Sequence, residues 1–246
     1  MPYLSSSDYI KAREAYTYTD FDVTFNIVQT GTLPYVGEFR GIFPRVVPLS
    51  HPTGINIRKF EIICSSVFCD ANFAEAKKSS TPIHIANLKA VICAIVHWKM
   101  ASQGGRAPRN EQNVLNKWQS NTYAQLLEAY NKKSLPLFKI GGVRIPTATA
   151  IIRFLYPDFY GIMDSRVVKN HTEPKKITSL NLRPADGYIN DVKENLTKYE
   201  TQYVPFLVSE ANALVAAGVK FCDIDHNGTR IYTSFRPCDI EMALFV

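Results

Sequence analysis

The amino-acid sequence predicts a mainly α-helical protein with a small antiparallel β-sheet, an α+β fold. Apolar residues recur at helical spacing over long segments, of which His84–Met100 is the clearest. Strand patterns are short: residues alternate in polarity over Phe21–Ile27, and two apolar runs flank an Asn227–Gly228 pair, which is typical of a hairpin turn. Hydrophobic residues make up 46% of the 246-residue chain, enough to build a core without disulfide bonds.

The length of the chain fits one large domain. We expect residues 1–80 to form a β-containing N-terminal elaboration and residues 81–246 to form a mostly helical core that carries a hairpin. Neither part contains an internal repeat or a clean linker. The whole chain is therefore predicted to fold as a single unit.

Within the first part, Ser7–Tyr16 is predicted to be a short helix capped by Ser7 or Asp8. The alternating strand 21–27 follows it. Residues 31–54 hold closely spaced Gly and Pro, so they are expected to be irregular with at most short edge strands. Ile57–Lys78 has an apolar pattern that predicts a helix.

The second part begins with a strong helix that starts near Pro82 and ends at Met100. Gln103–Asn110 reads as a glycine-rich basic loop, and 111–119 and 122–133 read as two helices. A short helix is expected after Asp164. Later elements are expected at 188–200 and 203–217 for two helices, 221–224 and 230–235 for the hairpin strands, and 237–246 for a closing helix.

Charge and cysteine content limit the partners and the compartment. Lysine and arginine outnumber the acids by 28 to 22, and a net charge of +6 favours anionic partners such as nucleic acid. The five cysteines form no C-x-x-C pair, and no basic segment followed by an apolar run begins the chain. We therefore expect free thiols and an intracellular protein of the cytoplasm, nucleoid or nucleus. No apolar stretch approaches the roughly 18 residues of a membrane span, so no membrane partner is expected.

The segment from Gly141 to Asp164 is the most informative for function. Gly141 and Gly142 can adopt backbone conformations that other residues avoid, and Pro146 suits the first turn of a helix. The residues that follow are small, which lets another backbone approach closely. Open N–H groups at such a helix start attract phosphate.

A single acid, Asp164, then stands inside an apolar run. A carboxylate at a fixed distance from a phosphate-binding turn suits chemistry on a nucleic acid. The pattern also fits an N-cap, because Ser165 and Arg166 can begin a helix. The two roles are compatible.

These residues resemble the helix-hairpin-helix superfamily of DNA glycosylases. Residues 140–148, Ile-Gly-Gly-Val-Arg-Ile-Pro-Thr-Ala, are similar to the superfamily hairpin Leu-Pro-Gly-Val-Gly-x-x-Thr-Ala, and Tyr156–Asp164 is similar to its Pro/Gly loop and catalytic Asp. Asp164 follows Gly142 by 22 positions, as in the endonuclease III-like branch. The resemblance covers residues 115–171 and implies a helix-hairpin-helix glycosylase-like core.

The resemblance implies a base-excision enzyme that acts on double-stranded DNA containing a modified base. Asp164 would be the catalytic carboxylate, stabilising positive charge on the sugar or activating water after the base leaves the stack. It implies no cofactor, and we expect a monomer. The residues expected to contact DNA are Gly141, Gly142, Val143, Arg144, Ile145 and Thr147 of the hairpin, with Lys132, Lys133 and Arg166 nearby.

Three departures from the superfamily pattern refine this expectation. Arg144 replaces the second glycine of the hairpin, and Pro146 occupies the position of the catalytic lysine of lyase-active members. Proline has no side-chain amine, so a monofunctional glycosylase without lyase activity is predicted. Only Cys222 and Cys238 follow Asp164, so the iron–sulfur cluster of some members is not expected, and neither is a metal site.

Other interpretations stay open at the level of sequence. The chain could be a non-catalytic helix-hairpin-helix module that binds DNA or a partner, and the hairpin could be an ordinary turn between helices. A nuclease would need a metal cluster, which the sequence does not offer. Aromatic residues that could stack on a flipped base, or equally belong to the core, are Trp98, Trp118, Tyr123 and Tyr160.

Overall fold

A computed structural model describes residues 3–16, 22–27, 37–42, 57–77, 82–100, 106–134, 143–170, 180–184, 187–224 and 229–246 of the chain. This part is mainly helical and contains two separate two-stranded antiparallel sheets. The coarse α+β prediction is confirmed, with two hairpins in place of one small sheet. Gly141, Gly142 and the turn predicted at 225–228 lie outside the described residues.

The first and last helices of the chain pack against each other. Helix α1 (Ser6–Glu14) is capped by Ser5, whose hydroxyl accepts the Asp8 N–H at 3.2 Å, so the cap expected at Ser7 or Asp8 is corrected. Helix α12 (Pro237–Phe245) confirms the predicted closing helix and packs against α1.

The N-terminal strands and the next two helices follow. Strands β1 (Asp22–Ile27) and β2 (Gly37–Ile42) form an antiparallel pair, and β1 packs on α4. The single helix expected over 57–78 is two, α2 (Ile57–Val67) and α3 (Asp70–Lys77). The Asn72 amide in the first turn of α3 donates to the Val67 carbonyl at the end of α2 at 3.0 Å, which satisfies a carbonyl that α2 leaves open.

Helix α4 (Pro82–Met100) confirms the strongest helix prediction. Helix α5 (Arg106–Asn116) starts inside the predicted basic loop, so Arg106 and Arg109 belong to a helix. Burial at helical spacing on the face toward α4 explains this extension of the helix. The buried residues of α5 are Ala107, Asn110 and Val114.

The central part of the chain carries the segments of functional interest. A π-helical turn η2 (Trp118–Thr122) leads into α6 (Tyr123–Lys132). Helix α7 (Ile145–Leu155) begins with Pro in its first turn, as predicted, and α8 (Ser165–Asn170) is the short helix expected after Asp164.

The two helices expected over 188–217 are one nearly continuous helical stretch, formed by α10 (Lys193–Lys198), a π-helical turn η3 (Tyr199–Tyr203) and α11 (Val204–Ala216). It starts later than predicted because the preceding residues are extended, with Leu182 bridging Ile189. The predicted hairpin follows as β3 (Lys220–Ile224) and β4 (Arg230–Ser234), paired antiparallel.

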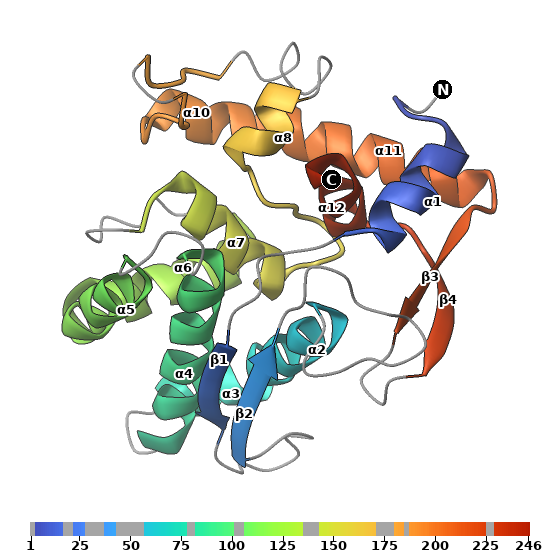
Figure 1. Cartoon of the computed structure of the whole chain (residues 1–246). Helices are drawn as coiled ribbons and strands as arrows, with labels where there is room; N and C mark the ends of the chain where they lie inside the picture. Colours follow the sequence, from blue (N-terminus) through green and yellow to red (C-terminus); the bar gives the residue numbers. More distant parts are fainter. Residues whose placement is uncertain are drawn as a thin grey trace.

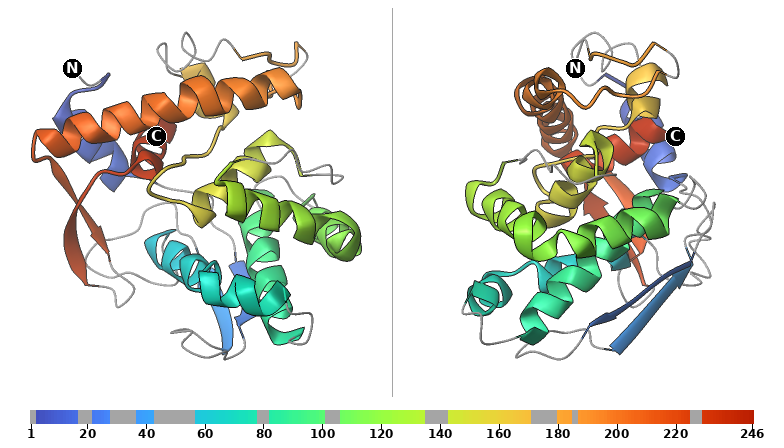
Figure 2. Two further views of the ribbon diagram at one scale, coloured as in Figure 1. Left: turned by 180° about the vertical axis from the view of Figure 1, so that it is seen from behind. Right: turned by 90° about the vertical axis from the view of Figure 1, so that its left-hand side faces the viewer.

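Figure 1 shows two groups of helices with α7 between them. Helices α2 to α6 and the β1–β2 pair lie on one side of α7, and the long α10–α11 stretch lies on the other side with α8, α12 and α1. Figure 2 shows the same separation from two further directions. The segment that joins α7 to α8 runs between the two groups (Figure 1).

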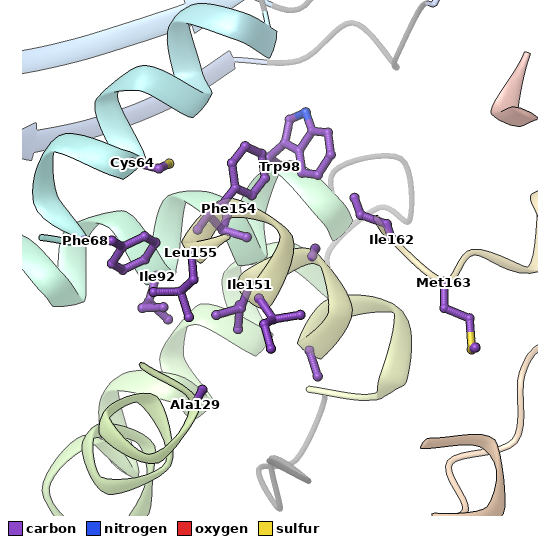
Figure 3. Close-up of a cluster of buried hydrophobic side chains, with 14 of the residues drawn as sticks. Cys64, Phe68, Ile92, Trp98, Ala129, Ile151, Phe154, Leu155, Ile162 and Met163 are labelled. Atoms are coloured by element: carbon purple, nitrogen blue, oxygen red, sulfur yellow. The ribbon is translucent and has the colours of Figure 1, made fainter. Parts of the chain in front are cut away.

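The core is built around α7, whose residues from Ile145 to Leu155 are mostly buried. Phe154 packs edge-on against Phe60 and Trp98, with ring centroids 4.9 and 5.3 Å away, and Figure 3 shows Phe154 beside Trp98. Trp98 and Trp118 are each 1% exposed, so both belong to the core rather than to a base-stacking surface. Across the described ranges, no helix has both the length and the apolar character that a membrane span requires.

Candidate active site around Asp164

Asp164 lies at the end of a segment without regular secondary structure and directly before α8. One of its carboxylate oxygens, Oδ1, accepts the backbone N–H of Arg166 at 2.9 Å, so the side chain caps α8 as the sequence allowed. The Asp164 side chain is 17% exposed, so it is partly open to solvent. Capping and access to solvent therefore coexist at this residue.

The second oxygen of Asp164 forms an ion pair with Lys99 from the last turn of α4, at 2.7 Å between Nζ and Oδ2. Lys99 is 4% exposed, so the pair is largely shielded from water. Burial alone would raise the pKa of Asp164, but the Lys99 ammonium and the Arg166 N–H outweigh it. The pKa of Asp164 consequently lies below its ordinary value, and the carboxylate is ionised at neutral pH.

The backbone of residues 161–164 belongs to no helix or sheet, so its polar groups need other partners. Two tyrosines of η3 supply donors: the Tyr199 hydroxyl binds the Gly161 carbonyl at 2.8 Å, and the Tyr203 hydroxyl binds the Ile162 carbonyl at 3.1 Å. All four of these residues are buried. Hydrogen bonds of this kind fix the path of the chain toward Asp164.

The N–H groups of the same segment are also satisfied by side chains. The Met163 N–H donates to the Thr149 hydroxyl of α7 at 3.1 Å, and the Ile162 N–H donates to the carboxyl group of Glu241 on α12. Figure 3 shows the Ile162 and Met163 side chains on this segment. Side chains from α7, η3 and α12 thus hold Gly161–Asp164 in place, which pre-organises the carboxylate.

Gly161 is required for this packing. A Cβ at this position would lie 2.6 Å from Leu207 Cδ1 and 2.7 Å from Glu241 Cβ, closer than carbon atoms can approach. The segment can therefore lie against α11 and α12 only with glycine here.

The described part of the predicted hairpin is mostly buried. Val143, Ile145 and Thr147 are each at most 2% exposed, whereas Arg144 is exposed and stands at the N-cap of α7 with an extended backbone. The Asp191 carboxylate accepts the Ile145 N–H at 3.2 Å. The N–H groups expected to be open at this helix start are therefore partly occupied by the protein's own acid, which corrects that expectation for Ile145.

The other cations expected to contact DNA lie at the surface. Lys132 is paired with Glu128 on the same helix at 2.7 Å, and Arg166 is exposed with its guanidinium 5.1 Å from the Phe245 ring. Lys133 ends α6 in a left-handed conformation, with φ +48°. Lys132, Lys133 and Arg166 are all exposed, although Lys132 shares its charge with a neighbouring acid.

The residues that sequence reasoning missed come from distant parts of the chain. Lys99 precedes Asp164 by 65 positions, and Glu241 lies on the closing helix. Tyr199, Tyr203 and Thr149 appeared to be ordinary helix residues. A lysine in an apolar helix face was the one local signal, since a buried charge needs a partner.

Within the described residues, no group of three or more His, Cys, Asp or Glu side chains is arranged to hold a metal ion. Comparisons with protein-family models, with curated proteins and with solved structures give no match to this chain.

Proposed function

We propose that the chain is a DNA glycosylase that removes a modified base from double-stranded DNA with Asp164 as its catalytic carboxylate. The observation that supports this most is the state of Asp164: it is ionised, rigidly held and still 17% exposed at the end of a fixed segment. A carboxylate that stabilises a reacting sugar must be reachable by the substrate, and the partial exposure of Asp164 allows this.

The chemistry suits a fixed carboxylate. When the N-glycosidic bond breaks, the base leaves with the bonding electrons and positive charge develops on the sugar. A preorganised anion beside the sugar stabilises this charge without reorganising during the reaction. Water then adds its oxygen to the sugar carbon, and the departing base takes up a proton.

The decisive experiment is the substitution Asp164→Asn, assayed for release of free base from a panel of modified duplexes. Asparagine can still cap α8 but carries no charge, so base release should fall by about 100-fold or more while DNA binding persists. Asp158→Asn is the matched control, because Asp158 precedes Asp164 in the same loop and its side chain is 70% exposed. Base release by Asp164→Asn at the wild-type rate would show that the assignment is wrong.

The enzyme is proposed to be monofunctional, although the structure places an amine beside the acid. Lys99 Nζ lies 2.7 Å from Asp164 and is nearly buried, and an ammonium in an ion pair has no lone pair for attack on the sugar. Pro146 offers no amine at all. Borohydride should therefore trap no covalent adduct between the protein and DNA.

Efficient trapping would contradict the monofunctional proposal. Its loss in Lys99→Met would then identify Lys99 as the nucleophile. Lys132→Met is the control, because Lys132 is an exposed lysine paired with Glu128.

A second candidate is a non-catalytic module that binds DNA. The observation in its favour is that both oxygens of Asp164 already have partners, Lys99 and the Arg166 N–H. This candidate predicts salt-sensitive DNA binding with no base released from any duplex of the panel, and Asp164→Asn would then alter stability alone.

A further inference from the structure

Glu241 is a buried acid placed against the segment that carries Asp164. It lies on α12 and is 2% exposed, and its Cβ is in close contact with Gly161. Its Oε2 atom has no hydrogen-bond partner among the described residues. Its carboxyl group accepts the Ile162 N–H, so it holds the backbone two residues before Asp164.

The charged and titratable groups that face Glu241 come from each element around it. Lys99 of α4 and Arg153 of α7 are the cations, and Asp164 is a second acid. Tyr199 and Tyr203 of η3 also face it. The remaining charges near α12 are held in ion pairs: Arg13 and Arg236 bind Asp239, and Glu61 binds both Arg236 and Arg153.

We propose that Glu241 is a positioning residue for the Asp164 site: in its neutral form it fixes the Ile162 backbone and leaves the Lys99 ammonium to Asp164. The proposal concerns the geometry around Asp164, and only its consequence for base release rests on the proposed function. Glu241 does not reach solvent, so it acts through Lys99 and the backbone and not on a substrate.

Charge explains why the neutral form matters. Two ionised carboxylates beside one ammonium would share its charge, and the Lys99–Asp164 pair would weaken. Burial, opposed by Lys99 and Arg153 and reinforced by Asp164, raises the pKa of Glu241 to about 8. At lower pH Glu241 is protonated and the pair is intact. Above that value its ionisation draws Lys99 away from Asp164.

Carbon-13 NMR of carboxyl and lysine side chains between pH 6 and pH 10 tests this directly. In the wild-type protein, the Asp164 Cγ and Lys99 Cε resonances should shift together with a midpoint near pH 8, and the Glu241 Cδ resonance should share that midpoint. In Glu241→Gln, which mimics the neutral acid, the Asp164 and Lys99 transition should vanish. Glu210→Gln is the control, because Glu210 is a buried acid that binds Tyr9 instead of Lys99.

Two results would overturn the proposal. One is that the Asp164 and Lys99 resonances still shift near pH 8 in Glu241→Gln. The other is that the Glu241 resonance of the wild-type protein titrates with a midpoint below pH 6, a measurement that does not depend on the folding of any variant. Where base release is measurable, the wild-type rate should fall about tenfold per pH unit above the midpoint, and Glu241→Gln should remove this fall. The NMR result decides the proposal even if no base is released, so the two failures are distinguishable.

Discussion

A buried carboxyl group such as Glu241 makes the free energy of unfolding depend on pH, because the unfolded chain can release its proton more easily than the folded protein can. Its pKa of about 8 lies above the ordinary 4.5, so the native state holds a proton that the unfolded state releases. The associated stability is fully present below pH 4.5 and is lost as the pH rises through 8. At about 1.4 kcal/mol per pH unit the loss amounts to several kcal/mol.

Glu241→Gln should remove this pH dependence. We expect the free energy of unfolding of the variant, relative to wild type, to increase between pH 5 and pH 8.5, as measured by urea denaturation. Asp158→Asn, at an exposed site in the same region, should track the wild type across this range. A constant difference between Glu241→Gln and wild type would contradict the raised pKa.

At the scale of elements, aromatic residues pack the end of α6 against the segment between α7 and α8 that leads to Asp164. Tyr156 stacks on Tyr130 at 6.3 Å, and Tyr160 stacks on Tyr199 at 6.2 Å. The Tyr160 hydroxyl also donates to the Lys133 carbonyl. Tyr160 therefore has protein partners on its ring and its hydroxyl, which favours a structural role over stacking on a flipped base.

The backbone conformation of Lys133 lowers the stability of the fold, whereas its positive charge belongs to the proposed DNA surface. Its φ of +48° is a conformation that glycine adopts without cost and other residues adopt at roughly 1 kcal/mol. We predict that Lys133→Gly raises the melting temperature by a few degrees while weakening DNA binding and reducing the slope of log affinity against log salt by about one. Lys117→Gly, at an exposed residue with negative φ, is the control for loss of a lysine. Unchanged DNA affinity in Lys133→Gly would remove Lys133 from the proposed DNA surface.

At the scale of the whole molecule, a buried ionic network ties the two ends of the chain together. Arg13 of α1 binds Asp239 of α12 at 3.0 Å and Asp223 of β3 at 3.2 Å, and Arg236 also binds Asp239. Burial alone would raise the pKa of Asp239, but the charges of Arg236 and Arg13 outweigh this effect and lower the pKa to about 2. This carboxylate therefore stabilises the fold above pH 4, and the contribution is lost as the pH falls toward 2.

The substitution Arg13→Met measures how much this network contributes to the free energy of unfolding. Asp239 would keep Arg236 but lose a buried partner, so we expect a loss of roughly 3 kcal/mol in the free energy of unfolding at pH 7. Lys11→Met on the exposed face of α1 should change stability by less than about 0.5 kcal/mol. Equal stability of the two variants would show that the network contributes nothing beyond packing.

The sequence by itself determined the local features of this protein. Helical periodicity located α4, Pro146 marked the start of α7, and the apolar runs on either side of Asn227–Gly228 predicted the antiparallel pair β3–β4. Such features depend on neighbouring residues, so a single sequence reveals them. The glycosylase-like core inferred from residues 115–171 stays a prediction.

The surroundings of Asp164 were decided only by the tertiary structure. Lys99, Glu241 and the η3 tyrosines reach Asp164 or its segment from distant positions because α4, α12 and η3 pack around the segment after α7. Asp191 reaches the start of α7 in the same way. Periodicity in the sequence indicates which face of a helix is buried. The partner of a buried charge depends on which helices pack against that face, and the local sequence does not determine this packing.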